Sequence, residues 1–233
     1  MSTDTDWQIG QVLKTATEKQ VGFKWSYMAP FLIYLIITSV IAVLQDATVG
    51  TGEGVAASLT QVIVNILVYP LGIGLGLLGI RRAAGKDTPL STLWEPYSQF
   101  IPLVVMLVLM GLLIVGGFFL LVLPGIYLAV AYSFAPYLMI EKNMGVWEAL
   151  ETSRKAITTC WWRYFGLLLI AVLLFIVGTI PLLIGLVWVL PIMAIAIGEV
   201  FVATFETASA EALAQTPTET SAAGPSLGHK AGV

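Results

Sequence analysis

The chain alternates between long uncharged, apolar runs and short stretches that hold its charges. No Asp, Glu, Lys or Arg occurs in residues 28–44, 55–80, 99–140 or 164–198. A helix needs about 20 apolar residues to cross the hydrocarbon core of a bilayer. The pattern therefore predicts an all-α, polytopic transmembrane helical bundle. We place six spans, at about 28–44, 56–80, 101–123, 124–140, 164–178 and 183–205.

Two boundaries between spans lie within uncharged sequence. Pro124-Gly125 separates the third span from the fourth, and such a pair is typical of a turn. The fifth and sixth spans are divided by GTIPLLIG, 178–185, which has proline and glycine but no charge. A single long, broken span at that point is the alternative, and it would give five crossings.

The composition agrees with a membrane protein and narrows the chemistry. Of the 233 residues, 58% are hydrophobic and 11% are charged, whereas a soluble domain carries roughly 25% charged residues. The net charge of −3 gives no reason to expect a nucleic-acid partner. Cys160 and His229 are the only residues of their types, which excludes a His/Cys metal set and a Ser-His-Asp or Cys-His set within the membrane. We therefore expect no metal, no cofactor and no enzymatic activity.

Lysine and arginine indicate the orientation, because cytoplasmic loops are enriched in them. With six spans, every Lys and Arg falls on one side of the membrane, so both termini are expected in the cytoplasm. A five-span chain would misplace only Lys230. The resulting divisions are an amphipathic N-terminal segment (1–27), a six-helix transmembrane domain (28–206) and a disordered cytoplasmic tail (207–233).

Three segments that precede pairs of spans show apolar residues at helical spacing: 7–21, 89–100 and 145–161. Such helices can lie in the cytoplasmic interface of the membrane, although Pro96 weakens a continuous helix in the second segment. Basic residues in the third segment are compatible with anionic lipid headgroups, but positive-inside bias alone explains them more simply. The residues expected to contact a partner or lipids are Trp147, Leu150, Arg154 and Lys155.

Gly74, Gly76 and Gly79 fall at the spacing G-x-G-x-x-G, which is known from dinucleotide-binding loops. Such a loop must follow a strand and open a soluble helix, whereas these glycines lie inside an apolar run. We favour a packing role, in which Gly72 and Gly76 form a G-x-x-x-G pair that lets another helix approach closely. Pro70 is expected to kink the same span.

Glu199 is the acidic residue well inside a span, about 10 Å from the cytoplasmic end of the sixth helix. An intramembrane carboxylate is costly and suggests a function, such as binding a proton or cation during transport. The structural alternatives are that it reaches the interface, stays protonated, or pairs with Arg163. Asn65, in the second span, can form an interhelical hydrogen bond or line a path together with Glu199.

Residues 123–157 carry a Pro-Gly-Ile turn, an acidic residue at the end of a span, and Glu-Ala-Leu in a following helix. This stretch resembles a group of uncharacterised bacterial integral membrane proteins, which are similar to the membrane domain of some glycerophosphodiester phosphodiesterases. The matching positions are Pro124, Gly125, Ile126, Glu141, Glu148, Ala149, Leu150, Ser153, Trp161 and Trp162. The resemblance implies a six-helix membrane protein of a bacterial inner membrane, and it transfers no catalytic residue.

These observations favour a non-enzymatic accessory or organising subunit. Its partners would be membrane lipids and either a membrane-protein partner or a second copy of the chain. The alternative is a carrier for a lipid or a small apolar solute, with Glu199 and Asn65 on its path.

Overall fold

The computed structural model describes residues 7–49, 54–179 and 185–206, and these residues form helices and no strand. Six helical stretches are long and apolar enough to cross a membrane, which confirms the predicted all-α transmembrane class. The predicted tail, 207–233, lies outside the described residues. The α-helices are α1 (Ile9–Lys19), α2 (Phe23–Val49), α3 (Val55–Ala83), α4 (Phe100–Leu120), α5 (Val122–Ala131), α6 (Ala135–Glu141), α7 (Val146–Thr179) and α8 (Leu186–Phe201).

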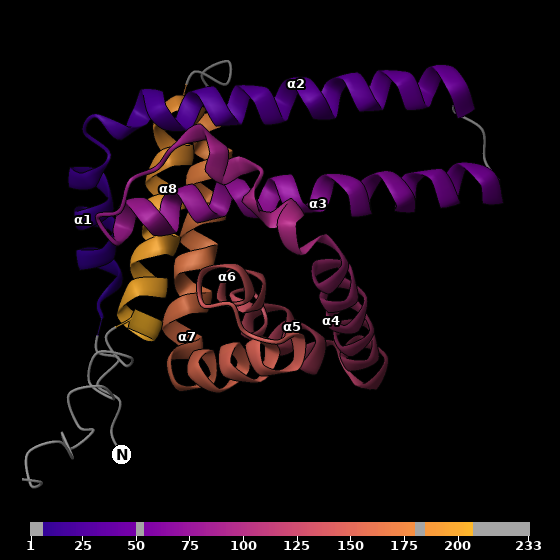
Figure 1. Cartoon of the computed structure of the whole chain (residues 1–233). Helices are drawn as coiled ribbons and strands as arrows, with labels where there is room; N and C mark the ends of the chain where they lie inside the picture. The colour runs from indigo at the N-terminus through magenta and orange to yellow at the C-terminus, as the bar shows by residue number, and fades with distance from the viewer. Residues whose placement is uncertain (1–6, 50–53, 180–184, 207–233) are drawn as a thin grey trace, which may run out of the picture.

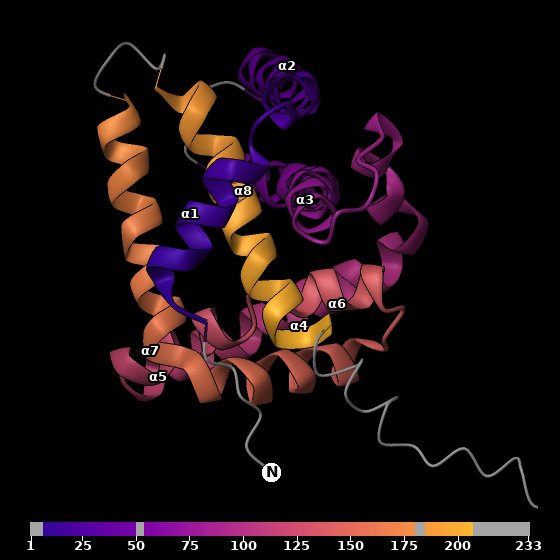
Figure 2. The same cartoon turned by 90° about the vertical axis from the view of Figure 1, so that its left-hand side faces the viewer.

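The other helices pack around the C-terminal half of α3, where its buried residues lie. Helices α2 and α3 form a long antiparallel hairpin that extends away from the other helices (Figure 1). Helix α8 crosses α3 and makes the most extensive contact in the fold with it, and α1 packs along α8 (Figure 2). The N-terminal segment is therefore part of the helical body through α1, whose Val12 and Ala16 are buried.

Glycines allow the close crossings of α3. A Cβ atom added at Gly74 would meet the backbone of Leu93, and one at Gly76 would meet the ring and hydroxyl of Tyr137. At Gly79, it would meet the backbone of Ala194 in α8. Each of the three glycines in the G-x-G-x-x-G spacing thus allows a different neighbour to approach α3 closely. This is a packing role, and it is not the role of glycines in a nucleotide-binding loop.

Only one member of the predicted G-x-x-x-G pair has a close neighbour. Gly76 lies against Tyr137, whereas a Cβ atom added at Gly72 would have nothing within 4 Å. The closest crossing is formed instead by Gly79 and Gly198, where the Cβ position of Gly198 falls on the backbone of Gly79 and Ile80. Gly198 is not among the packing residues that the sequence predicts.

The third and fourth spans meet earlier than the sequence suggested. Helix α4 ends at Leu120 and α5 begins at Val122, so Pro124 lies in the first turn of α5 and not between the helices. Proline is tolerated there because the first N–H groups of a helix have no acceptor within the helix.

The fourth span is broken in the middle, at Tyr132–Phe134, between α5 and α6. The break leaves backbone carbonyls that need partners inside the membrane. The buried Ser153 hydroxyl donates to the carbonyl of Ala131 at 2.7 Å, and the Ser133 hydroxyl donates to that of Val130 at 2.8 Å. The Tyr132 carbonyl accepts from the N–H of Ala135 at 3.0 Å. These three carbonyls therefore have hydrogen-bond partners within the protein.

The fifth span and the amphipathic segment before it form one helix, α7, with non-helical dihedral angles at Cys160. Its two limbs run in different directions, as Figure 2 shows. Helix α7 ends at Thr179 and α8 begins at Leu186, and each belongs to a stretch that is long and apolar enough to cross a membrane by itself, in agreement with six spans.

The segment 89–100 differs from the amphipathic helix that we expected. It forms two short 3-10 helices, η1 (Leu90–Leu93) and η2 (Glu95–Gln99). Pro96 lies at the start of η2 and removes a backbone donor that a continuous helix would need. A further short element, the π-helical turn η3 (Val202–Glu206), continues α8.

Candidate functional site

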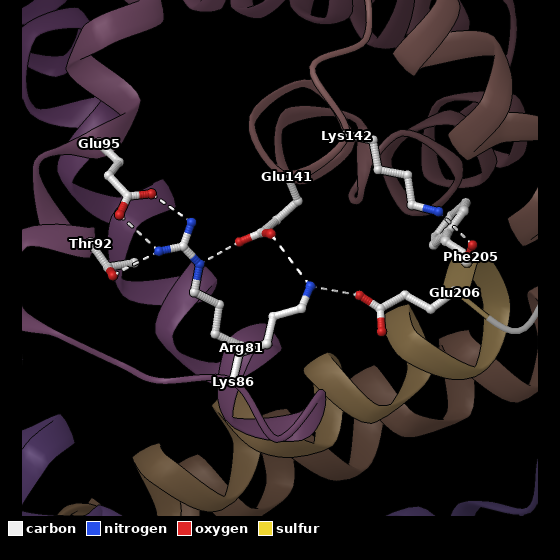
Figure 3. Close-up of polar contacts among 8 residues, drawn as sticks. All are labelled: Arg81, Lys86, Thr92, Glu95, Glu141, Lys142, Phe205 and Glu206. Atoms are coloured by element: carbon white, nitrogen blue, oxygen red, sulfur yellow. Dashed lines mark hydrogen bonds and ion pairs between the residues drawn. The ribbon is translucent and has the colours of Figure 1, made fainter. Parts of the chain in front are cut away.

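A cluster of charged and polar side chains gathers where α3, α6 and η3 end (Figure 3). We call it the polar hub, and it comprises Arg81, Lys86, Thr92, Glu95, Glu141 and Glu206. Its members come from four separate segments of the chain, and contacts among them are drawn in Figure 3.

Arg81 is the centre of the polar hub. Its guanidinium donates to both carboxylate oxygens of Glu95, at 2.8 and 2.6 Å, and to Glu141 Oε1 at 2.6 Å. The same group donates to the Thr92 hydroxyl at 3.0 Å. A planar guanidinium with five donors suits this bidentate arrangement, and a lysine in its place would lose the fork. Arg81 therefore joins the end of α3 to η1, η2 and α6.

Lys86 and Lys142 extend the connections toward η3. The ammonium group of Lys86 lies 3.0 Å from Glu206 Oε1 and 3.8 Å from Glu141 Oε2. Lys142 Nζ donates to the carbonyl of Phe205 at 2.6 Å. Burial lowers the pKa of the Lys142 ammonium group below its ordinary value. The end of α8, continued by η3, is thereby fixed beside the ends of α3 and α6.

The polar hub and Lys142 together have a balanced charge. They bring together three cations (Arg81, Lys86 and Lys142) and three carboxylates (Glu95, Glu141 and Glu206). The Glu141 side chain is 10% exposed and that of Arg81 is 19% exposed, so the central pair is largely shielded from water. Such an arrangement suits the positioning of helix ends, because each charge already has a partner within the chain.

A second polar group lies at the junction between α1, α3 and α8. Lys19 Nζ lies 2.6 Å from Glu199 Oε1 and donates to the carbonyl of Ala83, the last residue of α3. In return, Arg82 of α3 donates to the carbonyls of Lys19 and Val21, at 3.0 and 3.1 Å. Each of the two helix ends thus receives a cation from the other, and the unpaired terminal carbonyls are satisfied. We call Lys19, Arg82 and Glu199 the N-terminal junction.

Glu199 and Asn65 contact other groups than those that the sequence predicted. The ion-pair partner of Glu199 is Lys19 of α1, and the partner suggested by the sequence, Arg163, belongs to α7. Asn65 donates to the Gln61 carbonyl of its own helix at 2.9 Å. It lies about 24 Å along α3 from Arg81, at 1.5 Å per residue. A hydrogen bond between α2 and α3 in that region joins the side chains of Gln45 and Gln61, at 2.9 Å.

The predicted contact residues of α7 have different environments. Trp147 is exposed, whereas Leu150 is 2% exposed and belongs to the core of this chain. Arg154 and Lys155 both pair with Glu151, at 2.7 and 3.3 Å. Of the four residues, Trp147 is therefore the one that presents an apolar surface outward.

Sequence reasoning missed the polar hub, although a signal for it was present. Arg81, Glu95 and Glu141 all flank uncharged runs on the side where lysine and arginine are concentrated. The orientation rule counts basic residues and gives little weight to acidic ones. Acidic residues on the same side as the basic ones are the sign that charges can be neutralised between helix ends.

Comparison of the chain with protein-family models, with curated proteins and with solved structures finds no match. The six long apolar helical stretches are those of a polytopic helical membrane protein. The resemblance of residues 123–157 to a bacterial membrane domain remains a prediction.

Proposed function

We propose that the protein is a non-enzymatic accessory or organising subunit of a membrane, which holds apolar helices in fixed positions for lipids and a protein partner. The observation that carries the proposal is the polar hub. Its charges are matched within the chain, while the long faces of α2, α4 and the second limb of α7 are apolar and exposed. A rigid charged base with outward apolar faces suits association within a bilayer.

The proposal includes an orientation. Both groups of charges lie at helix ends that the distribution of lysine and arginine assigns to the cytoplasm. We infer that the polar hub faces the cytoplasm, that both termini lie on that side, and that the membrane is a bacterial inner membrane, in line with the resemblance of residues 123–157.

A second candidate is a carrier for a lipid or a small apolar solute. The observation in its favour is Glu199, a carboxylate that is 16% exposed on a candidate membrane span. Such groups often mark pathways for protons or ions. Its ion pair with Lys19 supports the structural alternative, because the carboxylate then anchors α1.

Native mass spectrometry of the tagged protein, gently extracted from its own membrane, tests the main proposal. We expect the chain to carry a protein partner or a second copy at a fixed stoichiometry. Trp147→Ala should weaken that association, whereas Thr159→Ala, an exposed change on the same helix, should not. A bare chain that retains one defined lipid would contradict the proposal and favour the carrier. Solute uptake into proteoliposomes that Glu199→Gln leaves unchanged would count against Glu199 in that alternative.

A further inference from the structure

The connection between α4 and α5 is an exposed, wholly apolar tip. Six consecutive side chains, from Phe118 to Leu123, are between 45% and 87% exposed. Residues 100–126 contain no side chain with a nitrogen or oxygen atom. A turn that reached the headgroups or water would place these large apolar side chains in a polar medium, which is unfavourable. We define residues 118–123 as the hairpin tip.

The backbone of the hairpin tip is suited to an apolar medium. Leu121 alone separates the two helices, and its N–H donates to the carbonyl of Gly117 at 3.0 Å. Pro124 has no N–H group, so one of the unpaired donors at the start of α5 is absent. Gly117 lies against Gly125, which lets the limbs approach closely. A connection of one residue exposes the least backbone, and backbone groups without partners are costly in hydrocarbon.

The hairpin of α2 and α3 differs from the α4–α5 hairpin in the polarity of its end and in the length of its helices. Charged Asp46 lies in the last turn of α2, and the sequence that joins α2 to α3 includes charged Glu53. Gln45 of α2 and Gln61 of α3 are hydrogen bonded to each other. Helix α3 has 29 residues and is about 43 Å long, whereas α4 has 21 residues and is about 31 Å long. The hydrocarbon core is about 30 Å thick. Helix α4 also runs obliquely to α3 (Figure 1). The distance that α4 covers along the direction of α3 is therefore shorter than α4 itself.

We propose that the α4–α5 hairpin ends inside the bilayer and that the hairpin tip binds the acyl chains of the leaflet opposite the polar hub. Helices α2 and α3 cross that leaflet completely. The partner of the hairpin tip is thus hydrocarbon, and neither water nor headgroups contact Leu121. This inference concerns how deep the helices reach, and it stands whether or not the proposed function does.

Labelling of single cysteines tests the depth of the hairpin tip. The native Cys160 is first replaced, Cys160→Ala, and size-exclusion chromatography and circular dichroism verify the fold. Cysteine is then introduced at the hairpin tip (Leu121→Cys or Val122→Cys), at the end of α2 (Asp46→Cys) and beside the polar hub (Asn143→Cys). The four positions are exposed on the protein, so accessibility from water distinguishes them. A membrane-impermeant maleimide is added to either face of sealed vesicles.

We expect Asp46→Cys to react from one face and Asn143→Cys from the other. Leu121→Cys and Val122→Cys should react about tenfold or more slowly from both faces, because a thiol in hydrocarbon does not ionise. In detergent with denaturant, all four should react equally. A fluorophore on Leu121→Cys should be quenched more by spin labels deep in the acyl chains than by labels near the headgroups. Labelling of Leu121→Cys from the same face and at the same rate as Asp46→Cys would overturn the inference.

Discussion

The crossing of α3 and α8 depends on the absence of side chains at Gly79 and Gly198, and Gly79→Ala tests this. The added methyl group would fall on the backbone of Ala194, so the helices would have to separate and no side chain could simply rotate away. Overpacking of this kind costs about 1–3 kcal/mol, and contact with backbone places it near 3. Higher helix propensity returns about 1 kcal/mol. The net expectation is a loss of about 2 kcal/mol in the free energy of unfolding.

The chain supplies its own reporter for this measurement. Cys160 is its sole cysteine and is 4% exposed in the kink of α7. A maleimide that becomes fluorescent on reaction should therefore follow unfolding as temperature rises. For a chain of this size, each kcal/mol shifts Tm by about 2–4 °C. Gly79→Ala should accordingly lower Tm by about 4–8 °C, and Gly198→Ala should act in the same direction.

Gly72→Ala is the matched control on the same helix. Nothing lies within 4 Å of the position that its Cβ atom would occupy, so only the gain in helix propensity should remain. Gly72→Ala should leave Tm unchanged or raise it slightly. If Gly79→Ala proved as stable as Gly72→Ala, the close crossing of α3 and α8 would be refuted.

Three other predictions concern the polar contacts. In a double-mutant cycle, Arg81→Met and Glu141→Gln should show a coupling of about 2 kcal/mol in the free energy of unfolding, and purely additive effects would contradict the ion pair. Lys19→Met and Glu199→Gln should couple by only about 0.5 kcal/mol, because the Lys19 side chain is more than a third exposed, and each should increase proteolysis of α1. Ser153→Ala should cost about 1–2 kcal/mol by leaving the Ala131 carbonyl without a donor in the core, while exposed Thr159→Ala should be neutral in the same unfolding assay.

The sequence was sufficient for the class of fold because the membrane imposes a strong local rule. A span must be long and apolar at every turn, so α2 and α3 are visible from composition alone. The break at Tyr132–Phe134 was not visible, because Ser153, about 20 residues further along the chain, supplies the hydrogen bond that makes it tolerable. Interruptions satisfied by distant residues leave no local signal.

The packing residues show the same limit. The spacing of Gly72 and Gly76 suggested one shared face, but α3 is contacted from several directions by Leu93, Tyr137 and Ala194. Spacing identifies glycines that lie on one side of a helix, and it does not identify which side meets a neighbour. Gly198 could be recognised only once α8 was placed against Gly79.

The N-terminal junction also sets a condition for the alternative carrier function. For Glu199 to bind a solute or a proton on a path, its carboxylate would have to leave Lys19. Lys19 also donates to the end of α3, and Arg82 donates back to the end of α1, so release would loosen the contact between these two helices. Transport through Glu199 should therefore be accompanied by greater proteolytic cleavage or hydrogen exchange in α1 when solute is present. If solute is taken up while α1 is as protected as it is without solute, Glu199 does not lie on the transport path. Its role is then to anchor α1.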